Sequence, residues 1–223
     1  MKSIWQALAR NRKLALKILI WVILIGAVAW AGKGLFKYKF YSTHDLDHHL
    51  ARGYDAVQTF AEGQFPLRWA GTLNYGCGVP VFNFFYPLLY YLSVIFFAFT
   101  KDMFLSFKLI SFASLLVGTV FFYLWARKET GNRWVGLAGA MLYLYAPYRL
   151  LLVYVRGSPE YLAYAIWPVV LYFYSLAFKE NNFKKFLWFC FFAAISGGLL
   201  TISHNFTVMF LMPILLLYLI LKF

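Results

Sequence analysis

Long apolar runs dominate the chain and restrict it to one class of fold. They cover residues 14–32, 82–99, 105–126, 134–153, 161–178, 186–202 and 206–221. Most approach the roughly 20 residues that a helix needs to cross a hydrocarbon core of about 30 Å. Hydrophobic residues make up 63% of the chain and charged residues 13%, which is outside the usual range for soluble domains. Because lipid offers backbone polar groups no partner, we expect an all-α integral membrane protein with a single membrane domain over residues 1–223.

The distribution of lysine and arginine decides which runs cross the membrane. If all of them crossed, the basic turns at 126–133 and 179–185 would lie outside, against the tendency of these residues to stay in the cytoplasm. The run 82–99 is the weakest candidate, because Pro87 leaves only about twelve apolar residues after it. We therefore predict that 82–99 forms an interfacial or re-entrant helix. About six transmembrane helices then remain, at 14–32, 105–126, 134–153, 161–178, 186–202 and 206–221.

This assignment places the protein in a bacterial plasma membrane with its N-terminus on the cytoplasmic side. A cleaved signal peptide is the alternative for the first run, since the small residues of "AVAWAG" imitate a signal-peptidase site. The length of that run and the spans that follow favour an uncleaved anchor. The chain stops without a polar C-terminal segment, and we expect it to be the N-terminal part of a longer protein.

The segments predicted to lie outside hold most of the titratable side chains. Residues 33–104, 154–161 and 203–205 contain six of the eight acids and all four histidines, which indicates one site on that side. The net charge of +13 comes from residues at the ends of apolar runs, which favours contacts with anionic lipid over nucleic acid. Cys77 and Cys190 lie in different settings and indicate neither a disulfide nor a thiolate metal site.

The first outer segment is predicted to contain an amphipathic helix on the membrane surface. Its apolar residues recur at spacings of three and four, at Leu46, Leu50, Tyr54, Val57 and Ala61. The other side carries Asp45, His48, His49, Arg52, Asp55 and Glu62. Such a helix would lie in the interface with its charged face toward water.

Asp45 has two competing interpretations. Ser42 and Asp45 match a capping box, in which the acid only closes the first helical turn. Asp45 also shares a face with His49, four residues later, whereas Asp47 points elsewhere, so a site role is the second interpretation. A zinc site is disfavoured, because the adjacent His48 and His49 cannot both face one ion from a regular helix.

Four further residues are candidates for binding. Arg68 is an outer arginine that the topology does not explain, and its guanidinium suits a phosphate; the alternative is an ion pair or a lipid headgroup contact. Arg156 and Glu160 flank Gly157 in a short outer loop, where a simple ion pair at a helix start is the alternative. His204 interrupts a long apolar region, and its alternative is that it merely turns the chain.

Taken in order, these pieces resemble a known family. The carrying motifs are "EGQFPLRW", "GCGVPVFNFFYPLLYYL", "YLYAPYRLLLVYVRGSPEYLA" and "SHN", which follow a one-span anchor and an acidic outer loop. They resemble bacterial membrane proteins labelled as related to 6-pyruvoyl-tetrahydropterin synthase. More broadly, the arrangement is similar to the GT-C class of glycosyltransferases, so a GT-C-like polytopic helical bundle is the expected architecture.

The resemblance also implies roles for particular residues. GT-C enzymes use an acid of the first outer loop, here best matched by Asp45 with Asp47 as its rival, and often a second-loop acid, here Glu160. Basic groups hold the donor phosphate, for which Arg68 and Arg156 are the candidates. His48, His49, Arg52 and His204 complete the expected substrate-binding set. A divalent ion, Mg or Mn, would be bound by Asp45, Asp47 and Glu160, although their spacing departs from the commonest GT-C pattern.

The resulting hypothesis is a cell-envelope glycosyltransferase. It would move a hexosyl or pentosyl group from a polyprenyl-phosphate-linked donor to an acceptor at the outer face of the plasma membrane. A transporter or lipid flippase is one alternative, and it predicts charged residues in mid-span. A non-catalytic membrane scaffold is the other. The sequence specifies neither the sugar, nor the acceptor, nor the oligomeric state.

Overall fold

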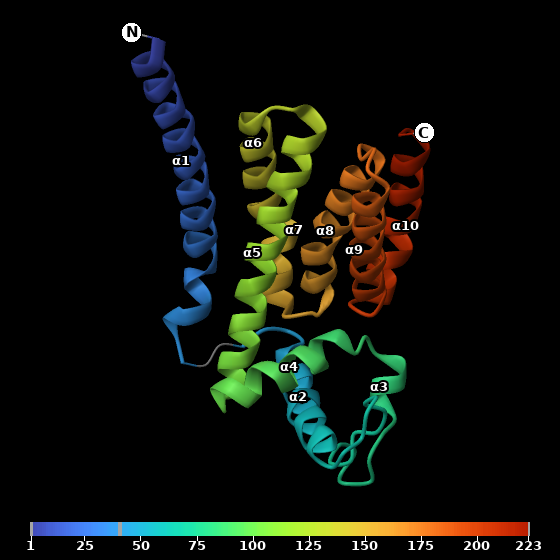
Figure 1. Ribbon diagram of the computed structural model, residues 1–223. Helices are drawn as coiled ribbons and strands as arrows, with labels where there is room; N and C mark the ends of the chain where they lie inside the picture. The colour runs from blue at the N-terminus through green and yellow to red at the C-terminus, as the bar shows by residue number, and fades with distance from the viewer. Residues whose placement is uncertain (1, 40–41, 223) are drawn as a thin grey trace.

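The computed structural model describes residues 2–39 and 42–222, and the fold in this part of the chain is helical throughout (Figure 1). One isolated antiparallel bridge joins Ala70 and Val79. The helices are α1 (Lys2–Lys37), α2 (Leu46–Ala61), α3 (Val81–Phe84), α4 (Leu88–Thr100), α5 (Met103–Thr130), α6 (Arg133–Leu144), α7 (Pro147–Leu151), the π-helix η1 (Leu152–Arg156), α8 (Glu160–Phe178), α9 (Phe183–Thr201) and α10 (Asn205–Ile220).

The helices form two layers. Figure 1 shows α1, α5, α6, α8, α9 and α10 running along a common direction, with α2, α3 and α4 gathered beneath one end of this bundle. Four helices are long and apolar enough to cross a membrane, and the bent pair formed by α6 and α7–η1 counts as a fifth. The remaining predicted span is α10, an apolar helix of 16 residues beside α9. The predicted all-helical membrane fold is confirmed.

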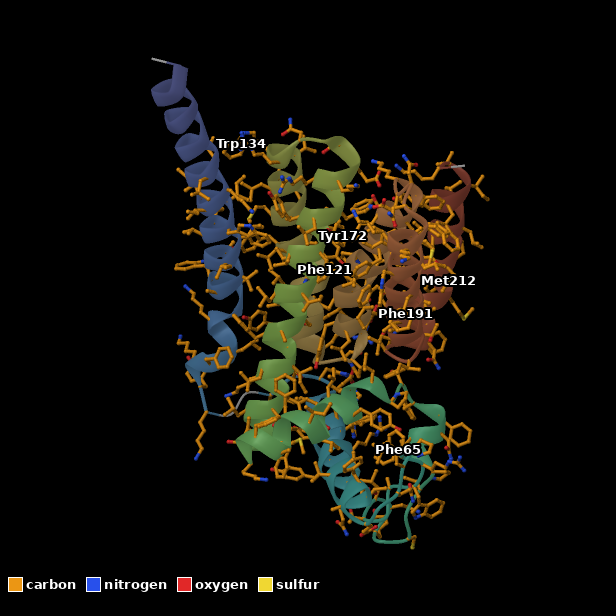
Figure 2. All side chains as sticks on the ribbon, in the orientation of Figure 1. Phe65, Phe121, Trp134, Tyr172, Phe191 and Met212 are labelled. Carbon is orange, nitrogen blue, oxygen red and sulfur yellow. The ribbon has the colours of Figure 1, made fainter. Side chains whose placement is uncertain are left out.

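The outer surface of the bundle is apolar, as a lipid-facing surface must be. Large side chains such as Phe191, Phe210 and Leu217 are exposed on α9 and α10. Aromatic residues also mark both ends of the molecule: Figure 2 shows Trp134 at the end of α6 and Phe65 in the layer of α2–α4. Aromatic side chains are typical of the two membrane–water interfaces.

The run predicted as one span over 134–153 is broken. Helix α6 ends at Leu144, and the continuation through α7 and η1 is bent from it by 44°. Pro147 explains the break, because it lacks a backbone N–H and forces the preceding Ala146 into an extended conformation with ψ of 124°. The broken segment brings the chain to Arg156 through a π-helix instead of a regular helix end.

This segment also carries a buried charge that the sequence interpretation overlooked. Arg149 is 3% exposed and donates to the backbone carbonyls of Ser114 and Leu115, at 2.9 and 3.0 Å. Its guanidinium also lies 4.5 Å from the Tyr143 ring. The span predicted over 134–153 therefore contains a buried charge. The arginine is satisfied by carbonyls and an aromatic face, and it ties α7 to α5.

Helix α4 lies on the same side of the bundle as the loops 154–161 and 203–205. It has 13 residues, about 20 Å of helix, which is shorter than a hydrocarbon core of about 30 Å. The backbone N–H of Leu88 donates to Ile202 O at 3.2 Å, which holds the start of α4 beneath α9. At its other end Lys101 adopts a left-handed conformation and Asp102 caps α5, so the chain turns back into the bundle. The helix therefore runs beneath the bundle instead of through it, as predicted.

This arrangement predicts a specific labelling pattern. Reporter insertions after residues 102 and 157 should report one compartment and insertions after 130 and 182 the opposite one, because one bundle crossing separates the two sets. With the N-terminus in the cytoplasm, 102 and 157 are outside. A membrane-impermeant thiol reagent applied to intact cells should then label the exposed Cys77 and spare Cys190 in α9. A cytoplasmic 157 together with an external 102 would contradict the arrangement.

Candidate active site beneath the bundle

Backbone hydrogen bonds bring the three predicted outer segments together. The N–H groups of His44 and Asp45 donate to the carbonyls of Val155 and Arg156, at 2.9 and 2.8 Å. Gly157, which follows directly, is in the left-handed region with a φ of 65°. A Cβ at this position would overlap with the hydroxyl of Thr43. The first outer segment therefore lies directly against the 154–161 loop, and only a glycine allows that approach.

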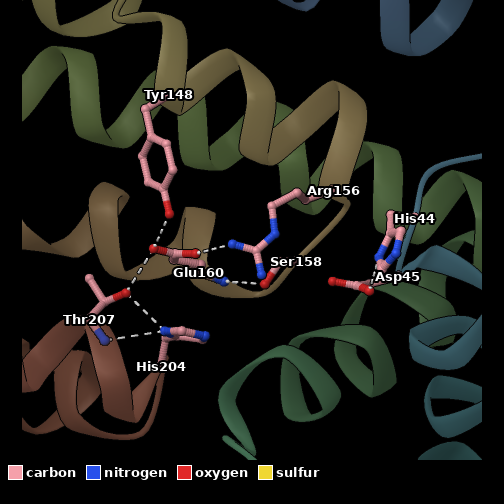
Figure 3. A network of polar contacts seen from close by, with 8 residues as sticks. All are labelled: His44, Asp45, Tyr148, Arg156, Ser158, Glu160, His204 and Thr207. Atoms are coloured by element: carbon pink, nitrogen blue, oxygen red, sulfur yellow. Dashed lines mark hydrogen bonds and ion pairs between the residues drawn. The ribbon is translucent and has the colours of Figure 1, made fainter.

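Glu160 is the centre of the polar cluster. It begins α8, and only 7% of its surface is exposed. Its carboxylate accepts hydrogen bonds from the hydroxyls of Tyr148 and Thr207, at 2.9 and 3.1 Å, and from Arg156 at 3.2 Å (Figure 3). These donors come from α7, α10 and η1. The expected Arg–Glu pair is present, and two hydroxyl groups from other helices complete it.

His204 is the N-cap of α10 and joins the same cluster. Its Nδ1 lies 2.8 Å from the hydroxyl oxygen of Thr207 and 3.3 Å from the backbone nitrogen of that residue. The imidazole packs on the ring of Tyr86 with centroids 4.5 Å apart. Burial lowers the pKa of His204 below its usual value of 6.5, the Glu160 carboxylate opposes this effect, and the Arg156 charge adds to it. His204 is therefore neutral near pH 7.

Asp45 does not act as a cap. It occupies the N-cap position of α2, but its side chain makes no hydrogen bond to the first turn. Its carboxylate instead pairs with Nδ1 of His44 at 2.6 Å, and its side chain is 27% exposed. Figure 3 shows this carboxylate reaching from the α2 side toward Arg156 and Ser158. The capping interpretation is therefore wrong in its mechanism, and the carboxylate faces the polar cluster.

His49 and Arg52 lie behind the cluster, on the inner face of α2. Nδ1 of His49 is 3.0 Å from the Tyr90 hydroxyl, and Arg52 donates to the same hydroxyl at 3.4 Å. The guanidinium of Arg52 also lies 4.3 Å from the Phe85 ring. Burial, and next the Arg52 charge, lower the pKa of His49 to about 4. His49 is thus a buried neutral imidazole that supports the site from within the α2–α4 layer.

Tyr86 lies where the two groups of residues meet. Burial raises the pKa of its hydroxyl; Arg52 and Arg156 oppose this effect, and Asp45 and Glu160 add to it. All four charged groups are thus close enough to act on one half-buried phenol. Sequence analysis missed this residue, because a tyrosine at a membrane surface is explained by the aromatic belt. It also missed Tyr148 and Thr207, whose donation to Glu160 depends on the break before α7 and on the position of α10.

Three candidates do not join the cluster. Asp47 and His48 are exposed on α2, away from Asp45. Arg68 is exposed on the loop that the Thr59 hydroxyl holds at the far end of α2, by donating to Trp69 O at 3.0 Å. A helix of 16 residues is about 24 Å long, so this loop is remote from Arg156. Arg68 and Arg156, the two candidates for the donor phosphate, therefore do not lie together.

The side chains expected to bind a divalent ion do not come together in the structure. Within residues 2–39 and 42–222, no three His, Cys, Asp or Glu side chains are arranged to hold a metal ion. Asp45, Asp47 and Glu160 do not form such a group: Glu160 is occupied by three donors and Asp47 is exposed. The residues described here therefore do not fit the divalent site that the resemblance implied.

An apolar cavity lies next to the polar cluster. It has a volume of about 270 Å³ and is enclosed by α4, α5, α8 and α9, with Leu88, Ile110, Val117, Leu162 and Leu199 among its lining residues. Leu162 is two residues from Glu160, and Leu88 is two residues from Tyr86. The cavity and the polar cluster therefore both include residues at the start of α8, at the end of the bundle where α4 lies.

A comparison with protein families matches residues 82–222 to the dolichyl-phosphate-mannose-protein mannosyltransferase family. The match covers more than half of the chain. The chain belongs to this family. It is therefore a multi-pass membrane protein with a GT-C-like helical fold. Arg156, Glu160 and His204 lie inside the matched region, whereas Asp45 precedes it.

A relative from Lactococcus lactis subsp. cremoris (strain MG1363), described as an uncharacterized protein, is 25% identical over 207 residues. The aligned region covers 90% of this chain and 33% of the relative, so the chain spans about one third of that protein's length.

Gly157 and Gly131 form a matched pair for testing the joint between the two layers. Both are left-handed, with φ of 65° and 68°, but a Cβ at Gly131 has no neighbour within 4 Å. Gly131→Ala should destabilise the protein by about 1 kcal/mol, the cost of the backbone conformation. Gly157→Ala should cost roughly 1–3 kcal/mol more, because it also pushes Thr43 away. Equal shifts of the apparent unfolding temperature in detergent would show that this contact is not tight.

His49 should make stability depend on pH. Its pKa is about 4 in the folded protein and 6.5 when unfolded, so below pH 6.5 the unfolded state binds more protons. We expect His49 to lower the free energy of unfolding by about 1.4 kcal/mol per pH unit between pH 6.5 and 4, and His204, whose pKa is also lowered by burial, to add a fall of its own below pH 6.5. His49→Gln should remove the contribution of His49 and leave a shallower dependence, whereas the exposed control His48→Gln should keep the full slope, as measured by unfolding at pH 7, 6 and 5. An unchanged acid sensitivity in His49→Gln would contradict the assignment.

Proposed function

We propose that the protein moves a sugar from a polyprenyl-phosphate-linked donor to an acceptor at the outer face of a bacterial plasma membrane. The observation that carries this proposal is that the Asp45–Arg156–Glu160 cluster and an apolar cavity lie at the same end of the bundle, where α4 and the start of α8 meet. A lipid phosphate with a sugar attached needs those two environments side by side. The family's description, which names a dolichyl phosphate, supports this substrate class.

Arg156 is the group best placed to bind the donor phosphate. Its side chain is 42% exposed, so it is reachable from the site, and the buried carboxylate of Glu160 holds it by one of its nitrogen atoms at 3.2 Å. A guanidinium has five donors in a fixed plane, so others remain for phosphate oxygens. When the bond between the sugar and the phosphate breaks, negative charge grows on the phosphate, and a cation already in place stabilises that charge. Arg52 contributes positive potential from the inner face of α2.

Asp45 is the group proposed to bind the acceptor. Its carboxylate faces Arg156 across the site and can accept a hydrogen bond from the acceptor hydroxyl, which directs that oxygen at the sugar carbon. The lipid chain of the donor would occupy the cavity between α4 and α8, whose lining is apolar. No step is assigned to a divalent ion, because the described residues do not form a site for one.

The transport alternative predicts unpaired charges in mid-span. Arg149 is a charged residue within the predicted span 134–153. Its guanidinium is engaged by two backbone carbonyls and the Tyr143 ring, and it is 3% exposed. A residue so enclosed joins helices and does not line a pathway. The polar groups that remain reachable collect at one end of the bundle, which favours chemistry at the surface.

Replacing Asp45 tests the proposal. Asp45→Asn should lower the rate of sugar transfer by about 10²–10⁴, the usual worth of general-base assistance, because an amide cannot take the proton of the acceptor hydroxyl. Asp47→Asn is the matched control and should stay within about twofold of wild type, because Asp47 is exposed and outside the cluster. The assay uses membranes containing the protein and polyprenyl-phosphate mannose with a labelled sugar, and it follows release of the free lipid phosphate and labelled glycan. Wild-type transfer in Asp45→Asn, or equal losses in both variants, would overturn the assignment.

A further inference from the structure

An open pocket lies at the end of the bundle opposite the candidate active site, around the turn that joins α5 to α6. It has a volume of about 550 Å³ and is lined by Arg127, Thr130, Gly131, Asn132, Arg133 and Trp134. A second pocket of about 360 Å³ shares Arg127 and Gly131 with the first and adds Leu124, Lys128 and Tyr172. The two pockets therefore meet at Arg127, and together they extend from the turn onto the surface between α5 and α8.

Three cations line the two pockets, and none of the lining residues is an acid. The cations are Arg127, Lys128 and Arg133. Within residues 2–39 and 42–222, none of their side chains forms an ion pair, and the guanidinium of Arg127 only lies 6.0 Å from the Tyr123 ring. Glu129, their neighbour in the sequence, is already engaged by three other donors. The described part of the protein therefore leaves this positive charge uncompensated.

The polar groups of the turn already have partners inside the protein. Oδ1 of Asn132 accepts a hydrogen bond from the backbone N–H of Trp134 at 2.8 Å, which caps α6. The Thr130 hydroxyl donates to Ala126 O, also at 2.8 Å. The helix ends therefore need no ligand, and what the pocket offers to one is the charge of its arginine and lysine side chains.

The pocket lies where the helices leave the hydrocarbon core. Helix α5 is long and apolar enough to cross the membrane, and it ends at Thr130, directly before the turn. Trp134 is 48% exposed, and Figure 2 shows it at this end of the bundle, with Tyr172 and Phe121 further into it. The rings of Phe121 and Tyr172 are in contact, with centroids 5.8 Å apart. An aromatic surface therefore continues from the charged turn toward the region of the lipid chains.

We propose that this pocket binds the headgroup of an anionic phospholipid, with the phosphodiester between Arg127 and Arg133. A guanidinium can donate two hydrogen bonds to one phosphate, and Lys128 adds a third positive charge. The glycerol and the acyl chains lie along Leu124 and Tyr172, a contact that a free phosphate ion cannot make. A zwitterionic headgroup carries an ammonium of its own, which the three cations repel. The site is remote from Asp45 and does not depend on the proposed glycosyl transfer.

Native mass spectrometry of the whole protein in a neutral detergent tests the site. The probes are phosphatidylglycerol, phosphatidylcholine and inorganic phosphate. We expect the wild type to bind phosphatidylglycerol more tightly than phosphatidylcholine, and inorganic phosphate at the same concentration not to displace it. Arg127→Gln and Arg133→Gln should each weaken phosphatidylglycerol binding by about fivefold, the usual worth of one basic side chain at an anionic lipid, and leave phosphatidylcholine binding unchanged.

Lys185→Gln is the matched control. Lys185 is exposed in the first turn of α9, at the same end of the bundle but outside the two pockets, so its loss removes one charge and should change binding by less than about twofold. Equal losses in Arg133→Gln and Lys185→Gln would overturn the proposal, because net charge alone would then govern binding. Equal affinity of the wild type for the two lipids would overturn it as well. Displacement of the lipid by inorganic phosphate would assign the pocket to a soluble anion instead.

A second measurement needs only the wild type, so it holds even if a variant does not fold. Phosphatidylglycerol with a photoreactive group on its acyl chain is added to membranes that contain the protein, and the labelled peptides are identified. Attachment should be concentrated on the peptides that carry Leu124 and Tyr172, and phosphatidylcholine with the same photoreactive chain should label them less. Labelling confined to α9 and α10 would contradict the assignment.

Discussion

Two backbone hydrogen bonds join the halves of this protein, and the site depends on them. The carbonyls of Val155 and Arg156 end the broken segment after α6, where a helix has no internal donor left to offer. Buried away from water, such carbonyls would be costly, so they require a partner. The N–H groups of His44 and Asp45 supply it, at 2.9 and 2.8 Å. The hydrogen bonds that satisfy this helix end thus also bring Asp45 to Arg156.

Two carboxylates, one at each end of the bundle, then connect its helices. Glu160 draws donors from α7, α10 and η1, because a carboxylate that is 7% exposed is tolerable only when several donors surround it. At the opposite end Glu129 of α5 accepts from Ser175 of α8 and from Tyr218 and Lys222 near the end of α10. Helix α10 is therefore held by a carboxylate at each end. Its start, capped by His204, is thereby tied to α8.

Local physical rules made much of this architecture predictable from the sequence. Apolar length gave the helices, Pro87 indicated that 82–99 would not cross, and the asymmetry of lysine and arginine gathered the outer loops on one side. Residues whose role depends on distant partners were not predictable. Tyr148 and Thr207 lie in runs that read as apolar spans, and only the break before Pro147 and the packing of α10 bring their hydroxyls to Glu160. For Arg68 the reason is the converse. Its chemistry suits phosphate, but its loop lies at the far end of α2, away from Arg156.

The residues of the site come from two parts of the chain, one inside the family match and one before it. They can lie on the same side of the membrane only if α4 stays beneath the bundle. The matched region supplies Arg156, Glu160, His204 and the apolar cavity, while Asp45 comes from the segment before it. A helix that threaded to the other leaflet between them would reverse the side of every later loop. Asp45 would then face one compartment and Arg156 the other. The 13 residues of α4, ended by Lys101 in a left-handed turn and by the Asp102 cap, are too short to do so. A short helix is thus what allows two separate parts of the sequence to share one site.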